Sequence, residues 1–451
     1  ILTMPIRSLL STLLLLFALC ATARTATAVD AATGEPLPAA SVFDRRGNVV
    51  GICSDNGLLP YAPDNAYPLT VRYIGYAPAT VASPAVERVR LHEISYDLPE
   101  ITIAPGKRHV LHLTAYVREY STLTTYTDTI FLFREKTVDF MIPSRNAGKY
   151  RGWTQPRLLA SRSCYRFSSA GGTDSVSNRF GQHFSWSDWI GIPAAVDLPP
   201  RLHTDTAAAD TIRGRYSPWS IWRRNADDVS IDINVLADTT ARRWVPALFA
   251  HSRRDVEFTD LRLKYIFADA GRYSVTADNL QAMTFNIETN GRGGGIYNQF
   301  RRNEPYFVST YAELYVTDRT YITVGEAKKL EKHPPKADEA GLFAPDFAPA
   351  PDAGVLALIE RVDTLDHDRL HRNIQPDQRL MRKFKGQVGP ITALRGAIQS
   401  LLKKYRGHGK RQSKARGERR EARVKLPIPA KQSGRRVAPR PDRLHHILTE
   451  H

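Results

Sequence analysis

The chain is poor in cysteine, with three among 451 residues, at positions 20, 53 and 164. So few cysteines cannot supply a disulfide framework or a structural zinc site, which excludes small disulfide-stapled domains and zinc modules. One bridge between Cys53 and Cys164 stays open, because an oxidising compartment would permit it.

Motifs of the common catalytic sites are also missing. The sequence holds no His-Glu-x-x-His helix, no Gly-x-Ser-x-Gly turn and no P-loop. The glycine-rich run 291–295 lies between two strand-like segments, which predicts a hairpin or bulge and not a phosphate cradle. We therefore predict a non-catalytic protein with no cofactor and no metal site. A glycosidase stays open, because it needs only two suitably spaced carboxylates.

Acidic residues become scarce towards the C-terminal end. Residues 1–381 hold 43 Lys+Arg against 42 Asp+Glu, whereas residues 382–445 hold 20 against 3. The formal charge of +17 therefore belongs to a tail, and the body of the protein is close to neutral.

What is present begins with an apolar run at residues 9–21, which follows Arg7 and precedes small residues. This is the layout of a secretory signal peptide, and the run is too short for a spanning helix with tails. We predict a leader at residues 1–23, cleaved after Ala23. Cleavage after Ala28 would remove residues that the next domain needs for its first strand. The mature protein is then exported, with no transmembrane segment.

Residues 24–104 alternate short apolar runs with turn signals. The runs are rich in β-branched and aromatic residues, and a turn follows about every 8–12 positions. This pattern predicts a small antiparallel β-sandwich. Asn56-Gly57 can supply the positive φ that a tight turn requires. The expected strands lie at residues 41–43, 49–53, 69–73, 80–81, 86–91 and 101–103.

Three stretches of this region carry a resemblance. Residues 29–42 (VDAATGEPLPAASV) resemble the opening of a carboxypeptidase-regulatory-like domain, a transthyretin-like sandwich. Residues 69–76 (LTVRYIGY) resemble its middle strand, and residues 98–103 (LPEITI) its exit strand. The family's Gly-Arg-Phe or Gly-Lys-Phe is replaced by residues 57–59 (GLL). Such domains are abundant in Bacteroides-group envelope proteins, which implies a structural or adaptor module in the periplasm, at the outer membrane or on the cell surface.

Residues 107–330 continue the alternating pattern, which predicts a larger all-β domain. Strand-like pieces recur at residues 231–236, 261–267, 283–287, 306–310, 311–316 and 321–324. Residues 127–143 (TDTIFLFREKTVDFMIP) resemble a segment of uncharacterised exported proteins of the Bacteroides group, for which no activity is implied.

All six tryptophans lie between residues 153 and 244. Flat indole faces suit stacking on sugar rings. The candidate glycan platform consists of Trp186, Trp189, Trp219 and Trp222. The competing interpretation, which we favour, is that these indoles fill the core of a large β domain.

Residues 331–406 combine a linker with amphipathic helices. Proline and alanine punctuate residues 334–352, which predicts the linker. Apolar residues at helical spacing in 355–365 predict a first helix, and a second stripe occupies 388–405. The second stripe suits either docking on the body or a position on a membrane surface.

Residues 407–451 are basic and have almost nothing apolar to bury, so we predict a disordered tail. Release of counterions would draw it to polyanions. The alternative that stays open is a solvated tail with weak, unselective contacts. In the envelope, the polyanions are lipopolysaccharide or acidic polysaccharide; nucleic acid is not expected for an exported protein, and no aromatics interleave the bases. The candidate polyanion contacts are Lys410, Arg411, Lys414, Arg416, Arg419, Arg420, Arg423 and Lys425.

Together these features predict a mainly β protein: an N-terminal transthyretin-like or Ig-like sandwich, a larger all-β domain, a short helical segment and a basic tail. The expected function is that of a non-catalytic envelope protein that binds or scaffolds. Two alternatives stay open: a glycan-binding or glycan-processing accessory protein, and an assembly partner of an outer-membrane protein complex.

Overall fold

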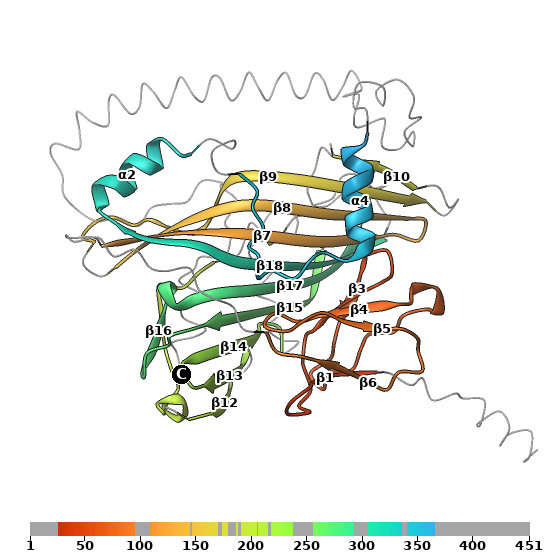
Figure 1. The fold of residues 1–451 in the computed structure, drawn as a ribbon, viewed down its shortest axis with the longest axis horizontal. Coiled ribbons are helices and arrows are strands. Elements are labelled where there is room, and N and C mark those ends of the chain that lie inside the picture. Colours follow the sequence, from red (N-terminus) through yellow and green to blue (C-terminus); the bar gives the residue numbers. More distant parts are fainter. Residues whose placement is uncertain are drawn as a thin grey trace, which may run out of the picture.

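In the residues that it describes, the computed structural model shows a mainly β protein with two short α-helices (Figure 1). The described residues are 26–94, 109–144, 147–169, 174–178, 186–187, 191–204, 206–214, 218–237, 256–292, 305–335 and 341–365. The mainly β prediction is confirmed. The predicted leader, the helical stripe at 388–405 and the basic tail lie outside the described residues.

The largest element is a ten-stranded antiparallel sheet in the order β10-β9-β8-β7-β18-β17-β15-β14-β13-β12 (Figure 1). Its long central strands are β7 (Val110–Thr124), β8 (Asp128–Pro143), β9 (Trp153–Ser169), β15 (Val256–Phe267), β17 (Leu280–Arg292) and β18 (Pro305–Ile322). The shorter strands are β10 (Asp174–Ser177), β12 (Ala208–Arg213), β13 (Trp219–Asn225) and β14 (Asp228–Asn234).

Two meanders build this sheet. Strands β7 to β10 follow one another, and so do β12 to β18 apart from β16 (Ser274–Thr276). The meanders join where β18 pairs with β7, in a register that runs from Phe307 opposite Thr124 to Ile322 opposite Val110. The predicted strands at 306–310 and 311–316 are thus parts of the single strand β18. The one at 321–324 was wrong in its second half, because β18 ends at Ile322 and Val324 is helical.

The period of two along each strand gives the sheet two faces. On β7, Leu113 and Val117 belong to a large apolar cluster on what we call the core face. Tyr116, Arg118 and Tyr120 alternate with them and lie on the opposite, sandwich face. The connection from β10 to β12 covers the core face with β11 (Ala195–Asp197), which pairs with β16, and with the short helix η3 (Pro200–Leu202).

The N-terminal region, residues 26–94, forms two small sheets around one apolar core, and we call it the sandwich. Strands β2 (Ser41–Phe43), β3 (Val49–Ile52), β4 (Leu69–Arg72) and β5 (Ala79–Val81) make an antiparallel sheet in the order β3-β2-β4-β5. The second layer pairs β1 (Thr27–Asp30) with β6 (Arg88–Leu91) in parallel, so the all-antiparallel expectation was wrong for this pair. The whole four-stranded sheet lies between them in the sequence and supplies the long crossover that parallel strands need.

The remaining elements are helical. α2 (Val324–Lys332) begins at a capping box, in which the Thr323 hydroxyl accepts from the Glu326 N–H at 3.2 Å. α4 (Ala353–Asp363) buries Val355, Leu358 and Val362, as the helical spacing predicted. Two further short helices are described, η1 (Asp64–Ala66) and η6 (Ala277–Asn279). Among the described residues, no helix has both the length and the apolar character needed to cross a membrane.

The segment predicted as a linker is not a free connection where the structure describes it. Residues 341–352 cross the ten-stranded sheet from Thr137 of β8 to Arg72 of the sandwich and lead directly into α4 (Figure 1). We call residues 341–365 the strap.

The turn at Gly57 requires a residue without a side chain. The φ of Gly57 is +73°, as the Asn-Gly pair predicted, and an added Cβ would lie 2.6 Å from the Ala28 carbonyl oxygen. Gly34 has the same φ of +73° but open space around it. We expect Gly57→Ala to lower the free energy of unfolding by about 3 kcal/mol and Gly34→Ala by only about 1 kcal/mol. Urea unfolding of the mature chain measures both, and equal losses would show that the Gly57 turn is free to shift.

Candidate functional site

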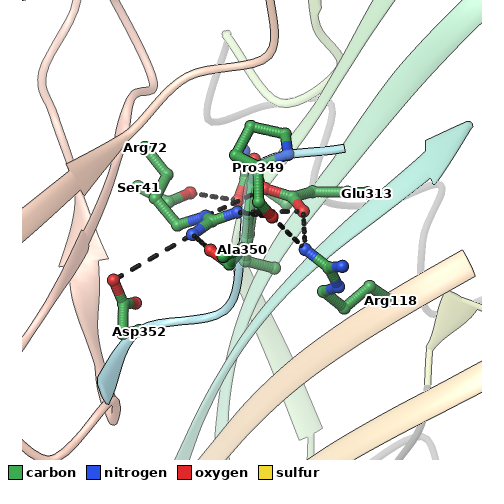
Figure 2. Close-up of polar contacts among 9 residues, drawn as sticks. Ser41, Arg72, Arg118, Glu313, Pro349, Ala350 and Asp352 are labelled. Carbon is green, nitrogen blue, oxygen red and sulfur yellow. Dashed lines mark hydrogen bonds and ion pairs between the residues drawn. The ribbon is translucent and has the colours of Figure 1, made fainter. Parts of the chain in front are cut away.

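The sandwich packs directly on the sandwich face of the ten-stranded sheet, and residues 349–354 of the strap lie along this contact (Figures 1 and 2). We call this contact the joint. Its centre combines Arg72 of β4, Arg118 of β7 and Glu313 of β18. The β7–β18 register places Glu313 directly opposite Arg118. Residues that are distant in the sequence therefore meet where three elements converge.

Glu313 is held by both arginines. Arg72 Nε donates to Glu313 Oε1 at 3.0 Å, and Arg72 Nη2 lies 3.4 Å from Oε2. Arg118 Nη1 lies 3.8 Å from the same Oε2. Figure 2 shows both guanidinium groups directed at Glu313 and at the strap. The carboxylate is thereby bound from the sandwich and from the sheet at once.

The strap supplies further acceptors. Arg72 donates to the carbonyl oxygens of Ala350 at 3.0 Å and Pro349 at 3.4 Å, and Arg118 donates to that of Pro349 at 2.6 Å. Asp352 Oδ1 lies 4.0 Å from Arg72 Nη1. The joint therefore brings two guanidinium cations together with two carboxylates, and no formal charge is left over among these four.

The protonation of the two carboxyl groups follows from their surroundings. Burial alone would raise the pKa of Glu313, but the charges of Arg72 and then Arg118 hold the pKa below its ordinary value. Burial raises the pKa of Asp352, and the nearby Arg72 offsets only part of that effect. Glu313 is therefore the firmly ionised partner of the pair of arginines.

Aromatic rings surround the ion cluster. Phe43 of β2 packs edge to face on Tyr120 and Tyr311, with ring centroids 5.2 and 5.7 Å apart. The Tyr311 hydroxyl donates to Glu313 Oε1 at 2.9 Å. Apolar contact thus holds the sandwich on the sheet. The Arg72–Glu313 pair is hydrogen-bonded, whereas Arg118 Nε, the Tyr120 hydroxyl and Asp352 Oδ2 are buried without a hydrogen-bond partner among the described residues.

Single hydrogen bonds continue the joint along the sheet. Ser41 Oγ donates to Asn286 Oδ1 of β17 at 2.9 Å, and the Val49 N–H donates to Thr122 Oγ1 of β7 at 2.8 Å. Both bonds connect a sandwich strand with a strand of the large sheet. They fix the direction of the sandwich strands relative to the sheet below.

A cation lies under the far side of the sandwich. Lys264 Nζ of β15 is 3.5 Å from the centroid of the Tyr73 ring, and the Tyr73 hydroxyl donates to Asp232 Oδ1 at 3.1 Å. Burial lowers the pKa of Lys264 to about 8, although Asp232 favours its charged form. The ammonium group is thus removed from water and lies against the face of the Tyr73 ring.

Two carboxyl groups face each other at the β3 end of the joint. Asp260 of β15 pairs directly across from Glu288 of β17. Arg262 Nε donates to Asp260 Oδ1 at 3.1 Å. Burial, and next the charge of Asp260, raise the pKa of Glu288 to about 7. A Cβ on Gly51 of β3 would lie 3.5 Å from Glu288 Oε1, so this carboxyl group also touches the sandwich.

The buried arrangement of these side chains suits a structural contact between the sandwich and the sheet, and it does not suit chemistry on a substrate. The side chains of Arg72 and Arg118 are each 2% exposed, and that of Glu313 is 3% exposed. A ligand in solution therefore cannot reach them while the joint is closed. Within the described ranges, no group of three or more His, Cys, Asp or Glu is placed to hold a metal ion.

The structure does not bring the four candidate tryptophans together. Trp186 and Trp222 lie in the core-face cluster and are 3% and 1% exposed. Trp219 is half-buried, with the Arg213 guanidinium carbon 4.7 Å from its ring centroid. Trp189 lies outside the described residues. The burial of two of the four indoles fits the competing interpretation, in which they fill the core.

Both cysteines of the mature region are free and buried. Cys53 lies in the sandwich core, and Cys164 lies on the sheet beneath α4. The bridge that the sequence left open is therefore not formed. Burial raises the pKa of the Cys53 thiol to about 12 and that of Cys164 to about 11. The eight basic candidates from Lys410 to Lys425 lie outside the described residues.

The sequence-based analysis missed the joint. One signal was present: Arg118 and Glu119 lie between apolar residues in the middle of β7, and Glu313 does the same in β18. Charges inside an apolar strand indicate a buried partner. Nothing in the pattern identifies that partner as Arg72, because the pairing depends on how the sandwich docks.

Glu288 makes the stability of the joint depend on pH. Its pKa is raised from 4.5 to about 7 in the folded protein, so folding is favoured while the proton is bound and loses that support as the pH rises through this window. We expect Glu288→Gln to leave stability unchanged near pH 4 and to raise it by about 1–3 kcal/mol near pH 8, relative to the native chain. Urea unfolding across this range measures the difference. The exposed Glu360→Gln in α4 is the control, and parallel curves for Glu288→Gln and the native chain would contradict the assignment.

No family model matches the chain, and no curated protein matches it. Among solved structures it is similar to lipovitellin, described for its lipid–protein interactions, with 8% identity over 48% of this chain and 26% of that chain and a TM-score of 0.25. It is also similar to an outer membrane channel from Pseudomonas putida F1, with 10% identity over 48% of this chain and 100% of that chain and a TM-score of 0.13. The chain spans about a quarter of the lipovitellin chain. Likenesses at these TM-scores carry no conclusion about fold or function.

Proposed function

We propose that this chain is a non-catalytic exported protein of the bacterial envelope, which acts as a binding or scaffolding module at the outer membrane. The observation that carries the proposal is the buried joint. Arg72, Arg118 and Glu313 fasten the sandwich to the ten-stranded sheet with almost no exposure to solvent. A scaffold needs a body of this kind, whose parts keep a fixed position relative to one another while the joint is closed.

The leader and the first strand support the export part of the proposal. β1 begins at Thr27 and its backbone pairs with β6 from Thr27 opposite Arg88. Cleavage after Ala23 leaves this strand whole, whereas cleavage after Ala28 would remove its first two residues. The mature chain would then start a few residues before the sandwich.

The basic tail supplies the proposed anchor. Its cations, from Lys410 to Lys425, would bind polyanions of the envelope, either lipopolysaccharide phosphates or acidic polysaccharide, by releasing counterions. Binding of this kind weakens steeply as salt rises, which distinguishes it from apolar contact. An outer-membrane protein complex with an acidic surface is the second kind of partner that the same charge would attract. Nucleic acid is not expected in this compartment.

Glycan binding or processing is the less favoured function. It would require several exposed indoles on one surface, and Trp186 and Trp222 are buried. Trp219 is the member of the predicted platform that keeps partial exposure among the described residues, and Arg213 stacks on it. A sugar ring would have to displace that guanidinium group to reach the indole face.

One fractionation experiment tests export and anchoring together. The full chain and a chain that ends at residue 407 are produced in a Gram-negative host, and the N-terminus of each product is read by mass spectrometry. We expect both to lose residues 1–23 and leave the cytoplasm. The full chain should sediment with outer membranes at low salt. Raising the salt from about 50 to 200 mM should lower the ratio of membrane-bound to soluble chain by about tenfold or more. The shortened chain should stay in the soluble periplasmic fraction.

Each result that differs contradicts a separate part of the proposal. A cytoplasmic product that keeps its leader would contradict export. Membrane sedimentation of the chain ending at residue 407, or binding that salt does not weaken, would contradict the tail as an anchor. Release by added neutral oligosaccharide, lost in Trp219→Ala but kept in the control Trp222→Phe, would favour the glycan function instead.

A further inference from the structure

The strap touches both bodies that the joint connects. On the sheet side, Thr137 Oγ1 donates to the Gly341 carbonyl at 2.7 Å, and the Phe347 ring packs edge to face on Tyr315 with centroids 6.0 Å apart. On the sandwich side, an added Cβ on Gly354 would lie 2.5 Å from the backbone carbon of Arg46. The strap therefore lies in close contact with both surfaces at once.

The composition of the strap suits this position. Pro345, Pro349 and Pro351 lack an N–H, so this part of the chain offers mainly carbonyl acceptors. Arg72 and Arg118 supply the matching donors, one from each body (Figure 2). Recognition is thus through the backbone of the strap and crosses the line where sandwich and sheet meet.

The second half of the strap is held by apolar burial. Val355, Leu358 and Val362 of α4 share one cluster with side chains of the sandwich and the sheet, and all three are at most 2% exposed. The other members of that cluster are Phe43, Val49, Tyr120, Phe131, Phe133, Cys164, Val176 and Tyr311. Complete burial of such side chains stabilises the seated position of α4.

Charge balance couples the strap to the docking of the sandwich. With the strap seated, Arg72 and Arg118 face Glu313 and Asp352. Without it, the two cations would keep a single carboxylate and would lose the carbonyl acceptors of residues 349 and 350. A buried cation without its partner is strongly destabilising. Separation of sandwich from sheet relieves this cost, because Arg72 leaves with the sandwich and water reaches both arginines.

We propose that residues 341–365 form a releasable lock: the sandwich stays docked on the sheet while the strap is seated, and release of the strap undocks it. Undocking exposes the aromatic surface of Phe43, Tyr120 and Tyr311. The coupling is reciprocal, so separation of the sandwich also loosens the strap. The strap is directly followed in the sequence by residues 366–451, so a partner that holds the C-terminal region is connected to the lock by the chain itself.

The two native thiols provide separate reporters. Cys164 lies in the cluster beneath α4, so its alkylation reports that the strap has lifted. Cys53 lies in the core of the sandwich, so its alkylation reports that the sandwich itself has opened. Undocking has its own reporter in the Val49 amide, which donates across the joint to Thr122. Hydrogen exchange at this amide rises when the sandwich leaves the sheet.

The test uses the mature full chain with Leu358→Ala and Val362→Ala combined, which weakens the buried face of α4. Leu356→Ala, on the same helix but 48% exposed, is the matched control. We expect maleimide labelling of Cys164 and hydrogen exchange of the Val49 amide to rise together, each by about tenfold or more, since a loss of 1.4 kcal/mol corresponds to a factor of ten. Cys53 should stay protected, and the control should match the native chain.

Two results would overturn the lock. In one, Cys164 becomes reactive while the Val49 amide keeps native protection, so the strap lifts without undocking. In the other, neither site changes. If Cys53 also reacts, the milder Asp352→Asn decides, because it removes the strap's charge and leaves α4 intact. If the labelling of Cys164 and the hydrogen exchange of the Val49 amide both rise in that variant, the lock is supported. If they do not rise together, the lock is contradicted.

Discussion

The buried ion pair between Arg72 and Glu313 is the interaction on which the architecture depends. It joins the sandwich to the ten-stranded sheet at a place where neither side chain is more than 3% exposed. Taking such charges out of water is unfavourable, so the pair is stable only while every partner is present. Arg118 and the strap carbonyls complete that set. Sandwich, sheet and strap consequently form one body rather than modules on a flexible connection.

The joint divides its tasks between apolar and polar groups. Phe43, Tyr120 and Tyr311 supply contact area, and apolar contact is tolerant of direction. The ion pair and the bond from the Val49 N–H to Thr122 are directional and tolerate little displacement. We infer that the aromatic contact favours association while the polar contacts select one orientation. This difference explains why buried charges lie at the joint, although apolar contact alone would keep the sandwich on the sheet.

Local structure was predictable from the sequence, and the assembly of the elements was not. The alternation in 41–43 and 69–73 and the helical spacing of 355–365 depend on neighbours in the chain, and each was predicted with bounds close to the observed ones. The pairing of β7 with β18 joins segments about two hundred residues apart, and no local pattern encodes that register. The packing of residues 341–352 was not predicted for a similar reason: a proline-rich stretch has no apolar period, and its partners are two distant arginines. The candidate site was missed because Arg72 looks like any outward charge until the sandwich is docked.

A double-mutant cycle on Arg72 and Glu313 tests the account most directly. Arg72→Met, Glu313→Gln and the combined variant are made in the mature chain, and the free energy of unfolding is measured by urea denaturation. Each single change should cost about 3–5 kcal/mol, because it leaves a buried charge unpaired. The combined variant should cost less than the sum of the two by about 2 kcal/mol. Additive losses would contradict the account, since they would mean that the two side chains do not stabilise each other across the joint.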